Sequence, residues 1–360
     1  MRITFFIGSL TGGGAERVTC SLASYLHSKG HTVHILTMSD EEPAYPISRG
    51  IERTSLINAH ERRGFLVSNA LRLYRFWRFL IRHKTDAYIV MLPVTTLMLL
   101  KMKWLVKAKV VAAERVYPSI YPLRKQKLLK QSAHKADGWV FQTQEEYDWY
   151  KEYIGSVPIR VIPNAINKDF IRPVYTGKRR KVIVSAGRLT HQKNHALLIK
   201  AFSKIRQAFP EYTLSIYGDG KERENLVQLI ENMGLKGRVE LCGYTKSIGD
   251  QINDASLFVL SSDFEGMPNA LMEAMALGLP CISTDCEGGG AQFLIENGTN
   301  GLITPKGDLE SLANAMNRML SDKVFAEQCG RNAHEICERL APERIYDEWE
   351  SFVTNVLKGK

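Results

Sequence analysis

Short, continuous apolar runs alternate with helical patterns along almost the whole chain, and this alternation restricts the fold more than any other feature. Apolar runs without polar alternation are typical of strands that are buried on both faces of a sheet. We therefore predict two doubly wound α/β domains with parallel sheets, six strands in each. The runs are residues 2–10, 32–38, 87–92, 109–114, 138–143 and 160–163 in the first half, and 181–186, 213–217, 239–243, 257–261, 281–284 and 301–304 in the second.

The strand and helix pattern is interrupted near residues 172–180, where Pro173, Gly177 and a basic run occur. A chain of 360 residues also favours about two domains. We predict a first domain over 1–172, a second over 173–341, and a final helix over 342–360 that packs back on the first domain. Ligands of such sheets bind beyond the carboxyl ends of the strands, so two facing domains imply a cleft between them.

Positive charge is concentrated in the first half of the chain. The formal net charge is +10, but residues 62–135 alone hold 17 basic and two acidic residues, a net +15. Residues 176–360 hold 22 basic and 24 acidic residues. A positive field attracts phosphate-rich partners such as nucleic acid, anionic lipid or a diphosphate substrate. The alternative is a solvated basic face without a partner.

The cysteines and the apolar segments indicate a cytoplasmic protein. The six cysteines show no CxxC and no metal-ligand spacing, and free thiols in apolar patterns fit a reducing compartment. The apolar start of the chain is short and meets three glycines, as a first strand does. Segment 88–106 is interrupted by Pro93, Lys101 and Lys103. Because this leaves it below spanning length, we expect no transmembrane helix.

Two strand ends are followed by residues that suit a phosphate group. Residues 12–14 are glycines before a helical pattern, where backbone amides can approach an anion closely. Arg188 and Lys193 follow the strand that ends near residue 186, and two cations there can neutralise a diphosphate without a metal. A plain turn and two surface cations are the alternatives. No Asp-x-Asp occurs, so the usual sequence cue for a metal-bound diphosphate is missing.

Segment 262–280 carries the strongest signal for chemistry. A strand ends at Ser261, Pro268 suits a first helical turn, and Gly278 precedes a second proline that stops the helix. Glu265 is therefore expected in the loop and Glu273 on the helix, where they can accept hydrogen bonds from sugar and ribose hydroxyls. A carboxylate near a helix start is often only a partner of the helix dipole, and this remains the alternative.

Five motifs in family-like order make the chain similar to the retaining glycosyltransferases of family 4, which have the GT-B fold, over essentially its full length. Each motif is common by itself, but the ordered set is specific. The motifs are Gly13-Gly14-Ala15-Glu16, Gly187-Arg188 with Gln192-Lys193-Asn194, Tyr217-Gly218-Asp219-Gly220, the segment from Glu265 to Glu273, and 284–290 followed by Asn300-Gly301-Leu302.

The resemblance implies a role for each matching residue. Arg188 and Lys193 grip the donor diphosphate, Glu273 binds the ribose, and Glu265 holds a hydroxyl of the donor sugar. The leaving phosphate takes the acceptor proton during attack on the same face, so that neither a protein base nor a metal or other cofactor is expected. Further donor contacts are implied for Gly13, Gly14, Gly187, Gly243, Tyr244, Met267, Pro268, Asn269, Ala270 and Leu271.

One segment departs from the family pattern. Many relatives carry a histidine near the donor sugar after the fourth strand of the first domain, and Arg115 stands at the aligned position here, next to Glu114. The segment with arginine at this position is similar to the corresponding segment of capsule and O-antigen transferases. We expect Glu114 and Arg115 to contact the sugar or an acceptor phosphate. The alternative is an ion pair of Arg115 with Glu114 or with another acid.

The helical pattern over 66–84 separates two faces. One face is apolar and is expected to lie on the core; it contains Leu66, Ala70, Leu73, Tyr74, Trp77, Leu80 and Ile81. The other face is basic with apolar side chains among the arginines, and it contains Leu71, Arg72, Arg75, Arg78, Phe79 and Arg82. Such a mixture suits an anionic membrane surface, because guanidinium groups pair with lipid phosphates. A solvated helix face is the alternative.

These observations favour a transferase that moves a hexose or N-acetylhexosamine from a UDP-sugar to a lipid-linked glycan, at the inner face of the bacterial cell membrane. A sugar-nucleotide epimerase with the same fold is the second hypothesis. A nucleic-acid-binding protein is the third, and it draws only on the basic region, because the chain shows no recognition motif for nucleic acid. We therefore expect no nucleic-acid partner.

Overall fold

The computed structural model describes residues 1–58, 61 and 64–359, so that Arg62 and Arg63 of the basic region lie outside the described residues. The chain forms two compact units, one of Met1–Ala165 with Glu343–Lys360 and the other of Ile166–Pro342. The sequence pattern placed the boundary at 172–173, whereas the structure divides the chain after Ala165. The last helix belongs to the first unit.

A seven-stranded parallel sheet forms the middle of the first unit, with the order β3-β2-β1-β4-β5-β6-β7. Six of its strands fall on the predicted apolar runs. The seventh, β3, was not predicted, because its sequence Glu-Arg-Thr-Ser is polar and it lies at the edge of the sheet beside β2. The strands are β1 (Arg2–Ile7), β2 (Thr32–Thr37), β3 (Glu52–Ser55), β4 (Ala87–Met91), β5 (Lys109–Ala113), β6 (Gly138–Phe141) and β7 (Ile159–Val161).

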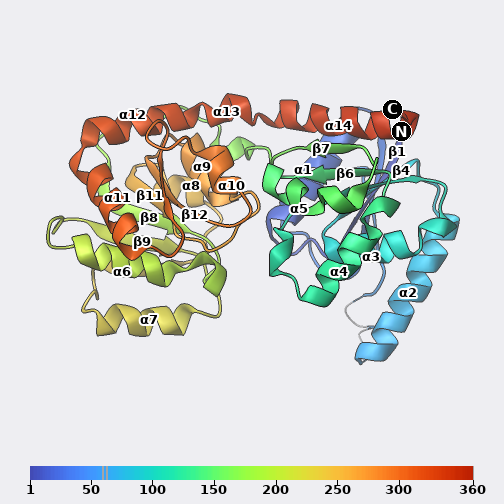
Figure 1. Ribbon diagram of the computed structural model, residues 1–360, viewed down its shortest axis with the longest axis horizontal. Coiled ribbons are helices and arrows are strands. Elements are labelled where there is room, and N and C mark those ends of the chain that lie inside the picture. Colours follow the sequence, from blue (N-terminus) through green and yellow to red (C-terminus); the bar gives the residue numbers. More distant parts are fainter. Residues whose placement is uncertain (59–60, 62–63, 360) are drawn as a thin grey trace. The chain divides into compact units, whose positions relative to one another are not determined.

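Helices cover both faces of this sheet (Figure 1). The final helix α14 lies along α1, where Asp347 accepts a hydrogen bond of 2.6 Å from the Tyr25 hydroxyl and Glu350 is 2.7 Å from His31. Its apolar face reaches the sheet, since a Cβ on Gly138 would lie 2.9 Å from Val356. The helices are α1 (Gly14–Ser28), α2 (Phe65–Arg82), α3 (Pro93–Lys101), α4 (Leu123–Ser132), α5 (Gln144–Ile154) and α14 (Pro342–Lys358).

Helix α2 is rotated relative to the sequence prediction. Phe76 is fully buried and stacks on Phe6 of β1 with ring centroids 4.8 Å apart. Of the stripe expected on the core, only Leu80 is buried; Leu66, Ala70, Leu73, Tyr74, Trp77 and Ile81 are exposed. The prediction of a core stripe is therefore wrong. The physical reason is that an aromatic ring at position 76 fits the sheet's apolar surface, and this contact sets the helix rotation.

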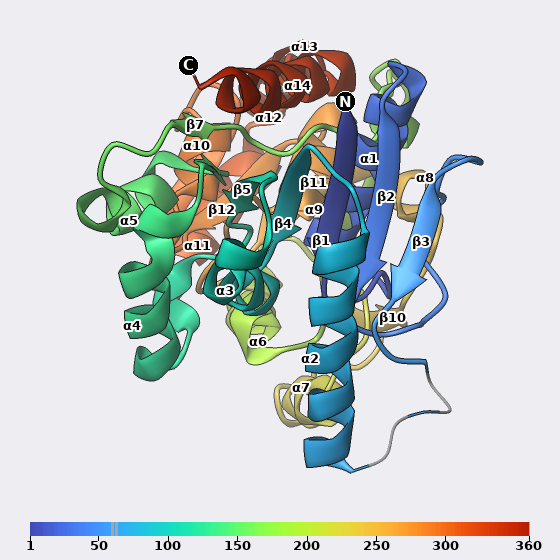
Figure 2. The ribbon, with the colours of Figure 1, turned by 90° about the vertical axis from the view of Figure 1, so that its right-hand side faces the viewer.

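In the first unit, α2 also extends beyond its neighbours. Figure 2 shows its first turns continuing past the ends of the adjacent strands, and Figure 1 shows the same from the side. Across the residues that the structure describes, no helix combines the length and the apolar character needed to cross a membrane.

The second unit is built on a parallel sheet of six strands, the number predicted, and their order is β10-β9-β8-β11-β12-β13. Its strands are β8 (Arg180–Ala186), β9 (Thr213–Tyr217), β10 (Val239–Gly243), β11 (Ala255–Leu260), β12 (Cys281–Asp285) and β13 (Leu302–Pro305). The helices are α6 (His195–Ile205), α7 (Arg223–Asn232), α8 (Ile248–Ile252), α9 (Asn269–Ala276), α10 (Gly290–Leu294), α11 (Leu309–Ser321), α12 (Lys323–His334) and α13 (Ile336–Arg339).

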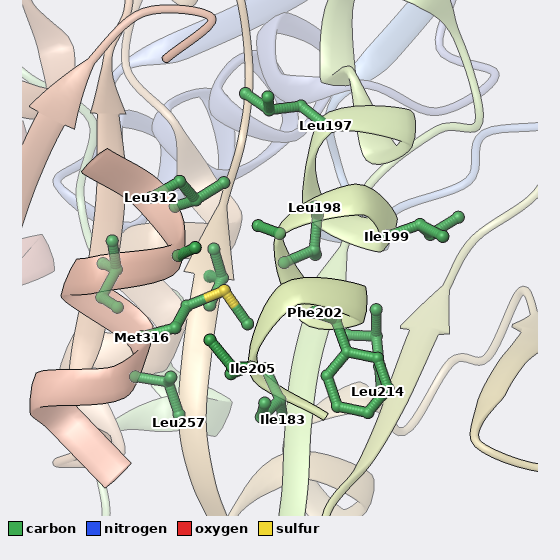
Figure 3. Packing of buried hydrophobic residues seen from close by; sticks show 14 of the residues in the cluster. Ile183, Leu197, Leu198, Ile199, Phe202, Ile205, Leu214, Leu257, Leu312 and Met316 are labelled. Carbon is green, nitrogen blue, oxygen red and sulfur yellow. The ribbon is translucent and has the colours of Figure 1, made fainter. Parts of the chain in front are cut away.

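The core of the second unit lies between the sheet and the helices α6 and α11. Figure 3 shows Leu198 of α6 directed toward Met316 of α11 above Ile183 and Leu257 of the central strands, while Phe202 of α6 lies beside Leu214 of β9. All six are fully buried. Burying side chains of this size contributes roughly 1.5–3 kcal/mol each to the free energy of unfolding. This core holds β8 and β11 in place, and the loops of the candidate site leave from their ends.

Candidate functional site

The candidate site lies where the order of the second sheet reverses direction. Strands β8 and β11 are neighbours in the middle of the sheet, and the chain leaves them toward opposite sides. Loops that diverge at such a point leave a crevice outside the carboxyl ends of the strands, where doubly wound proteins bind ligands. The loop after β8 carries Arg188 and Lys193, and the loop after β11 carries Glu265.

Lys193 and Glu265 form a closely packed ion pair. The Lys193 Nζ donates to Oε1 of Glu265, and their side chains are only 14% and 9% exposed. The same carboxylate oxygen accepts a hydrogen bond of 2.7 Å from the Ser262 hydroxyl. Gln192 donates 2.9 Å to the carbonyl of Phe264 and ties the two loops together. Charge-assisted hydrogen bonds of this kind fix both groups in position.

Arg188 is exposed beside this pair. Its neighbour Gly187 lies under the Lys193 side chain, because a Cβ on Gly187 would be 3.0 Å from the Lys193 Cε. The Gly187 amide donates 2.9 Å to the carbonyl of Tyr217, which anchors the backbone. Arg188 has no acidic partner within the part of the chain that the structure describes. Two cations, one paired and one unpaired, thus stand at the end of β8.

Asn194 connects the loop after β8 to the start of α6 and to the loop after β11. It adopts a left-handed backbone with φ of 44°, and its side-chain oxygen accepts a hydrogen bond from the Leu197 amide. Its side-chain nitrogen donates 2.9 Å to Asp263. Sequence reasoning missed the parts of Ser262 and Asp263. Their position directly after a buried strand was the signal that could have found them.

His195 is the first residue of α6, directly after the loop that carries the two cations, and is 3% exposed. Burial, and then the charge of Lys193, lower the pKa of His195 to about 4. The imidazole therefore stays neutral at physiological pH and adds no positive charge to the site.

The segment from Glu265 to Glu273 divides as predicted between a loop and a helix. Pro268 is the residue before α9, and Glu273 lies in the second turn and is partly exposed. The Glu265 amide donates 2.8 Å to the carbonyl of Glu287. Met267 and Leu271 are buried in the second unit, so their side chains face the core. A ligand at this helix start would meet backbone amides, together with Asn269 and Ala270.

The turn at Gly243 and Tyr244 ends β10. Gly243 has a φ of 75°, and its carbonyl accepts a hydrogen bond of 2.8 Å from Gly218 after the neighbouring strand β9. Tyr244 is 76% exposed, which leaves its ring available to a planar ligand. The expected donor-binding residues of the second unit therefore all lie at the carboxyl edge of one sheet.

In the first unit, the glycine loop after β1 leads into α1. Gly13 precedes the helix and Gly14 is its first residue. A Cβ on Gly13 would lie 2.4 Å from a carboxylate oxygen of Glu16. The carboxylate thus folds back against the helix N-terminus, where negative charge is favoured.

Glu114 and Arg115 are both buried at the carboxyl end of β5. The Tyr150 hydroxyl donates 2.8 Å to Glu114, and the Arg115 guanidinium donates 3.2 Å to Asn164. The guanidinium also lies 5.0 Å from the ring centroid of Trp349 on α14. These contacts are all with the protein itself. A contact of Arg115 with sugar or acceptor stays a prediction, and the geometry gives it a second role in holding α14.

This buried cluster has shifted proton affinities. Burial raises the pKa of Glu114 to about 7, and burial followed by the charge of Glu114 raises the pKa of Glu146 to about 8. Burial lowers the pKa of Arg115 to about 10. Within this cluster, Nε and Nη2 of Arg115 and Oε1 of Glu146 are buried without a hydrogen-bond partner. The cluster is therefore polar but incompletely paired.

All six cysteines are free, and five of them are buried, as their apolar surroundings predicted. Among residues 1–58, 61 and 64–359, no group of three or more His, Cys, Asp or Glu side chains is arranged to hold a metal ion.

Comparison with known proteins gives both units the same assignment. Residues 12–170 match Glycosyltransferase Family 4, and residues 167–336 match Glycosyl transferases group 1. The two matches meet near the division between the units and include the glycine loop after β1 and the site at β8 and β11. The chain is a family 4-like glycosyltransferase of the GT-B fold.

Individual relatives agree with this assignment. A Campylobacter jejuni protein named GalNAc-alpha-(1->4)-GalNAc-alpha-(1->3)-diNAcBac-PP-undecaprenol alpha-1,4-N-acetyl-D-galactosaminyltransferase is 24% identical over 99% of each chain. A Streptomyces coelicolor exopolysaccharide phosphotransferase is 36% identical over 62% of this chain, which spans only 24% of that relative's length. The structure of Anabaena HepE in complex with UDP has a TM-score of 0.83 at 19% identity, over 99% of this chain and 100% of that one.

Proposed function

We propose that this glycosyltransferase moves a hexose or N-acetylhexosamine from a UDP-sugar to a lipid-linked glycan, with retention of configuration and without a metal, during assembly of a bacterial surface polysaccharide. The observation that carries the proposal is the pair of cations, Arg188 and Lys193, beside Glu265 at the switch point of the second sheet. The undecaprenol diphosphate in the Campylobacter relative's name supports a lipid-linked acceptor. The UDP bound to the structurally similar HepE supports the nucleotide.

The two cations are suited to receiving the charge of a departing nucleoside diphosphate. Negative charge grows on the leaving phosphate as the bond to the sugar breaks, and fixed cations aimed at that point lower the barrier. Lys193 is already oriented by Glu265, so little reorganisation accompanies the reaction. Arg188 supplies a second charge with a planar fork that matches phosphate oxygens.

The carboxylates hold the donor in this scheme. Glu265 uses Oε1 for Lys193 and Ser262, and Gln192 is 3.5 Å from its Oε2. In this scheme Oε2 accepts a hydrogen bond from a hydroxyl of the donor sugar. Glu273 accepts the ribose hydroxyls from the second turn of α9. The acceptor hydroxyl attacks on the face that the diphosphate leaves, and its proton passes to the leaving phosphate. No protein base or added cofactor takes part, and the enzyme works as a peripheral protein at the cytoplasmic side of the membrane.

The decisive experiment compares Arg188→Ala and Lys193→Ala with Lys200→Ala. Lys200 is an exposed lysine on α6 of the same unit and serves as the matched control. Removing either site cation should lower kcat by about 10²–10³-fold, the size typical of a lost charge-stabilising group. The Lys200 variant should keep wild-type activity. The measurement is transfer, and slow hydrolysis, from a panel of nucleotide sugars with and without EDTA.

Two outcomes would overturn the proposal. Activity that disappears with EDTA and returns with Mg²⁺ or Mn²⁺ would contradict the role of the two cations. Consumption of the UDP-sugar to its epimer without any acceptor would instead favour the epimerase. Proton NMR of the product tests retention, since the anomeric configuration of the donor must be preserved.

A further inference from the structure

The exposed side of α2 is apolar, although this helix belongs to the most basic region of the chain. Leu66 is 80% exposed, and Leu73, Tyr74, Trp77 and Ile81 are between 43% and 53% exposed. Leu66, Leu73, Trp77 and Ile81 are separated by seven, four and four residues, and Tyr74 adjoins Leu73, so the five lie along one side of the helix. The rings of Tyr74 and Trp77 are 6.1 Å apart, so they form one continuous aromatic surface. An apolar stripe of this length has a partner as a rule.

A groove between α2 and α3 continues this surface. It has a volume of about 390 Å³, and apolar side chains form most of its wall. Leu73 belongs to both the stripe and the groove, and Val94 at the outer edge of α3 is 46% exposed. Lys101 is the one charged residue of the lining, which otherwise consists of Leu73, Val94, Leu97, Met98 and Met102.

Positive charge borders the stripe on both sides. Arg78 and Arg82 are exposed on the arc of α2 that follows the stripe, and Lys101 stands at the groove on the other side. The other two arginines of α2 are bound within the protein: Arg75 makes two hydrogen bonds of 2.6 Å to Glu61, and Arg72 donates 3.0 Å to Asn69 of the same helix. The basic face expected from sequence is thus partly used internally, and an apolar stripe between cations remains.

We propose that the α2–α3 face, defined as the α2 stripe with the adjoining groove, inserts into an anionic phospholipid leaflet. The apolar side chains enter the acyl layer, and Arg78, Arg82 and Lys101 pair with lipid phosphates. A helix with aromatic and aliphatic residues on one side and cations beside them lies in the plane of an interface in this way. The groove accommodates one acyl chain next to Leu73. This proposal rests on the proposed function, because it names the surface that brings the enzyme to its lipid-linked acceptor.

Charge complementarity favours lipid over a second copy of the chain. In a symmetric dimer through this face, the cations bordering the stripe would meet the same cations of the other copy or lie close to them, and like charges at an interface are unfavourable. An anionic leaflet neutralises all of them at once.

The experiment measures co-sedimentation of the full chain with vesicles of phosphatidylcholine alone and of phosphatidylcholine with phosphatidylglycerol, at low and at high salt. Trp77→Glu should reduce binding to the anionic vesicles by about tenfold or more, because it removes an inserted ring and adds a repelled charge. Trp77→Phe should bind as the wild type does. Val324→Glu is the matched control, since Val324 is 77% exposed on α12 of the other unit.

Insertion predicts that part of the binding survives high salt, and that lipids brominated in the acyl chain quench tryptophan fluorescence less in Trp77→Phe than in the wild type. Equal binding of wild type and Trp77→Glu, or an equal loss in Val324→Glu, would overturn the proposal. So would a wild-type dimer that Trp77→Glu converts to a monomer, since the face would then be a dimer interface. Hydrolysis of the donor without acceptor should be unchanged in Trp77→Glu, which separates this test from that of the transferase.

Discussion

Lys193 and Glu265 are 72 residues apart in the chain, yet their side chains act as one buried group. Both side chains are largely shielded from solvent. The lysine neutralises the carboxylate there, and the carboxylate orients the lysine. Ser262 and Gln192 restrain the pair from two sides. At this scale the candidate site is a set of side chains that hold one another in position, with Arg188 exposed beside them.

The Glu114–Arg115–Glu146 cluster leads to a prediction about pH. The folded-state pKa of Glu114 is about 7 and that of Glu146 about 8, both raised from 4.5 by burial. Between pH 6.5 and pH 8 the folded state therefore holds protons that the unfolded state has already lost, so the free energy of unfolding falls as the pH rises. The limit is about 1.4 kcal/mol per pH unit for each proton.

Glu146→Gln imitates the protonated acid and should flatten this slope. The measurement is urea unfolding at pH 6.5 and pH 8, followed by tryptophan fluorescence. Glu152→Gln, an exposed carboxylate on the same helix α5, should keep the wild-type slope. A stability that rises over this pH range in the wild type would contradict the assignment. The buried histidines act in the opposite direction, because the pKa values of His34 and His195 are lowered to about 4 and near pH 6.5 only the unfolded state binds protons at these residues. Both glutamine variants keep these histidines, so the difference between their two slopes isolates the contribution of Glu146.

At the scale of elements, the loop that carries Glu265 is fixed by the start of α10. A Cβ on Gly290 would lie 1.9 Å from the carbonyl oxygen of Gly266 and 2.7 Å from Pro268. The close approach of two backbones, rather than an unusual backbone angle, is what requires glycine at this position. The parallel bridge between Phe264 and Glu287 joins the same two segments.

Gly290→Ala should therefore displace the loop. We expect a loss of about 1–3 kcal/mol in the free energy of unfolding of the second unit, the size typical of overpacking. Transferase activity should fall with it, because Glu265 moves away from Lys193. Thermal unfolding measures the stability, and transfer from the UDP-sugar measures the activity. Gly8→Ala is the control for stability, since a Cβ there meets nothing within 4 Å, and an equal loss in both variants would contradict the steric explanation.

For helix α2, the sequence pattern that predicts a helix does not predict which side of the helix is buried. Its length and amphipathic character follow from sequence, but the side that faces the sheet does not. The stacking of Phe76 on Phe6 turns the longer apolar stripe toward solvent, and this rotation is the basis of the proposed lipid contact.

At the scale of the whole molecule, the chain returns to its first unit after completing the second. Trp349 of α14 is 1% exposed, and its ring covers the buried Arg115. The two ends of the chain are also in contact, since Thr354 lies 3.7 Å from the sulfur of Met1. The first unit is therefore complete only when the last residues of the chain have been added to it.

Trp349→Ala should destabilise the first unit by about 3–5 kcal/mol, the usual cost of truncating a buried tryptophan. It also uncovers the guanidinium of Arg115. All five tryptophans lie in the first unit, so tryptophan fluorescence follows its unfolding selectively. UDP-dependent protection of the second unit should persist. Val324→Ala, at an exposed site, should change stability by less than about 0.5 kcal/mol. A similarly small effect of Trp349→Ala would show that α14 does not stabilise the first unit.

The sequence by itself determined the fold class, twelve of the thirteen strands in the described part of the chain, and the loops that carry the residues proposed to bind the donor. These features depend on local periodicity and on turn residues, which act over a few positions of the chain. Only the tertiary structure decided that Lys193 pairs with Glu265, that Arg115 lies beneath Trp349, that the polar segment 52–55 joins the sheet, and which side of α2 is buried. Each of these is a contact between segments far apart in sequence, and its energy depends on the shape and charge of a partner surface that local pattern does not contain.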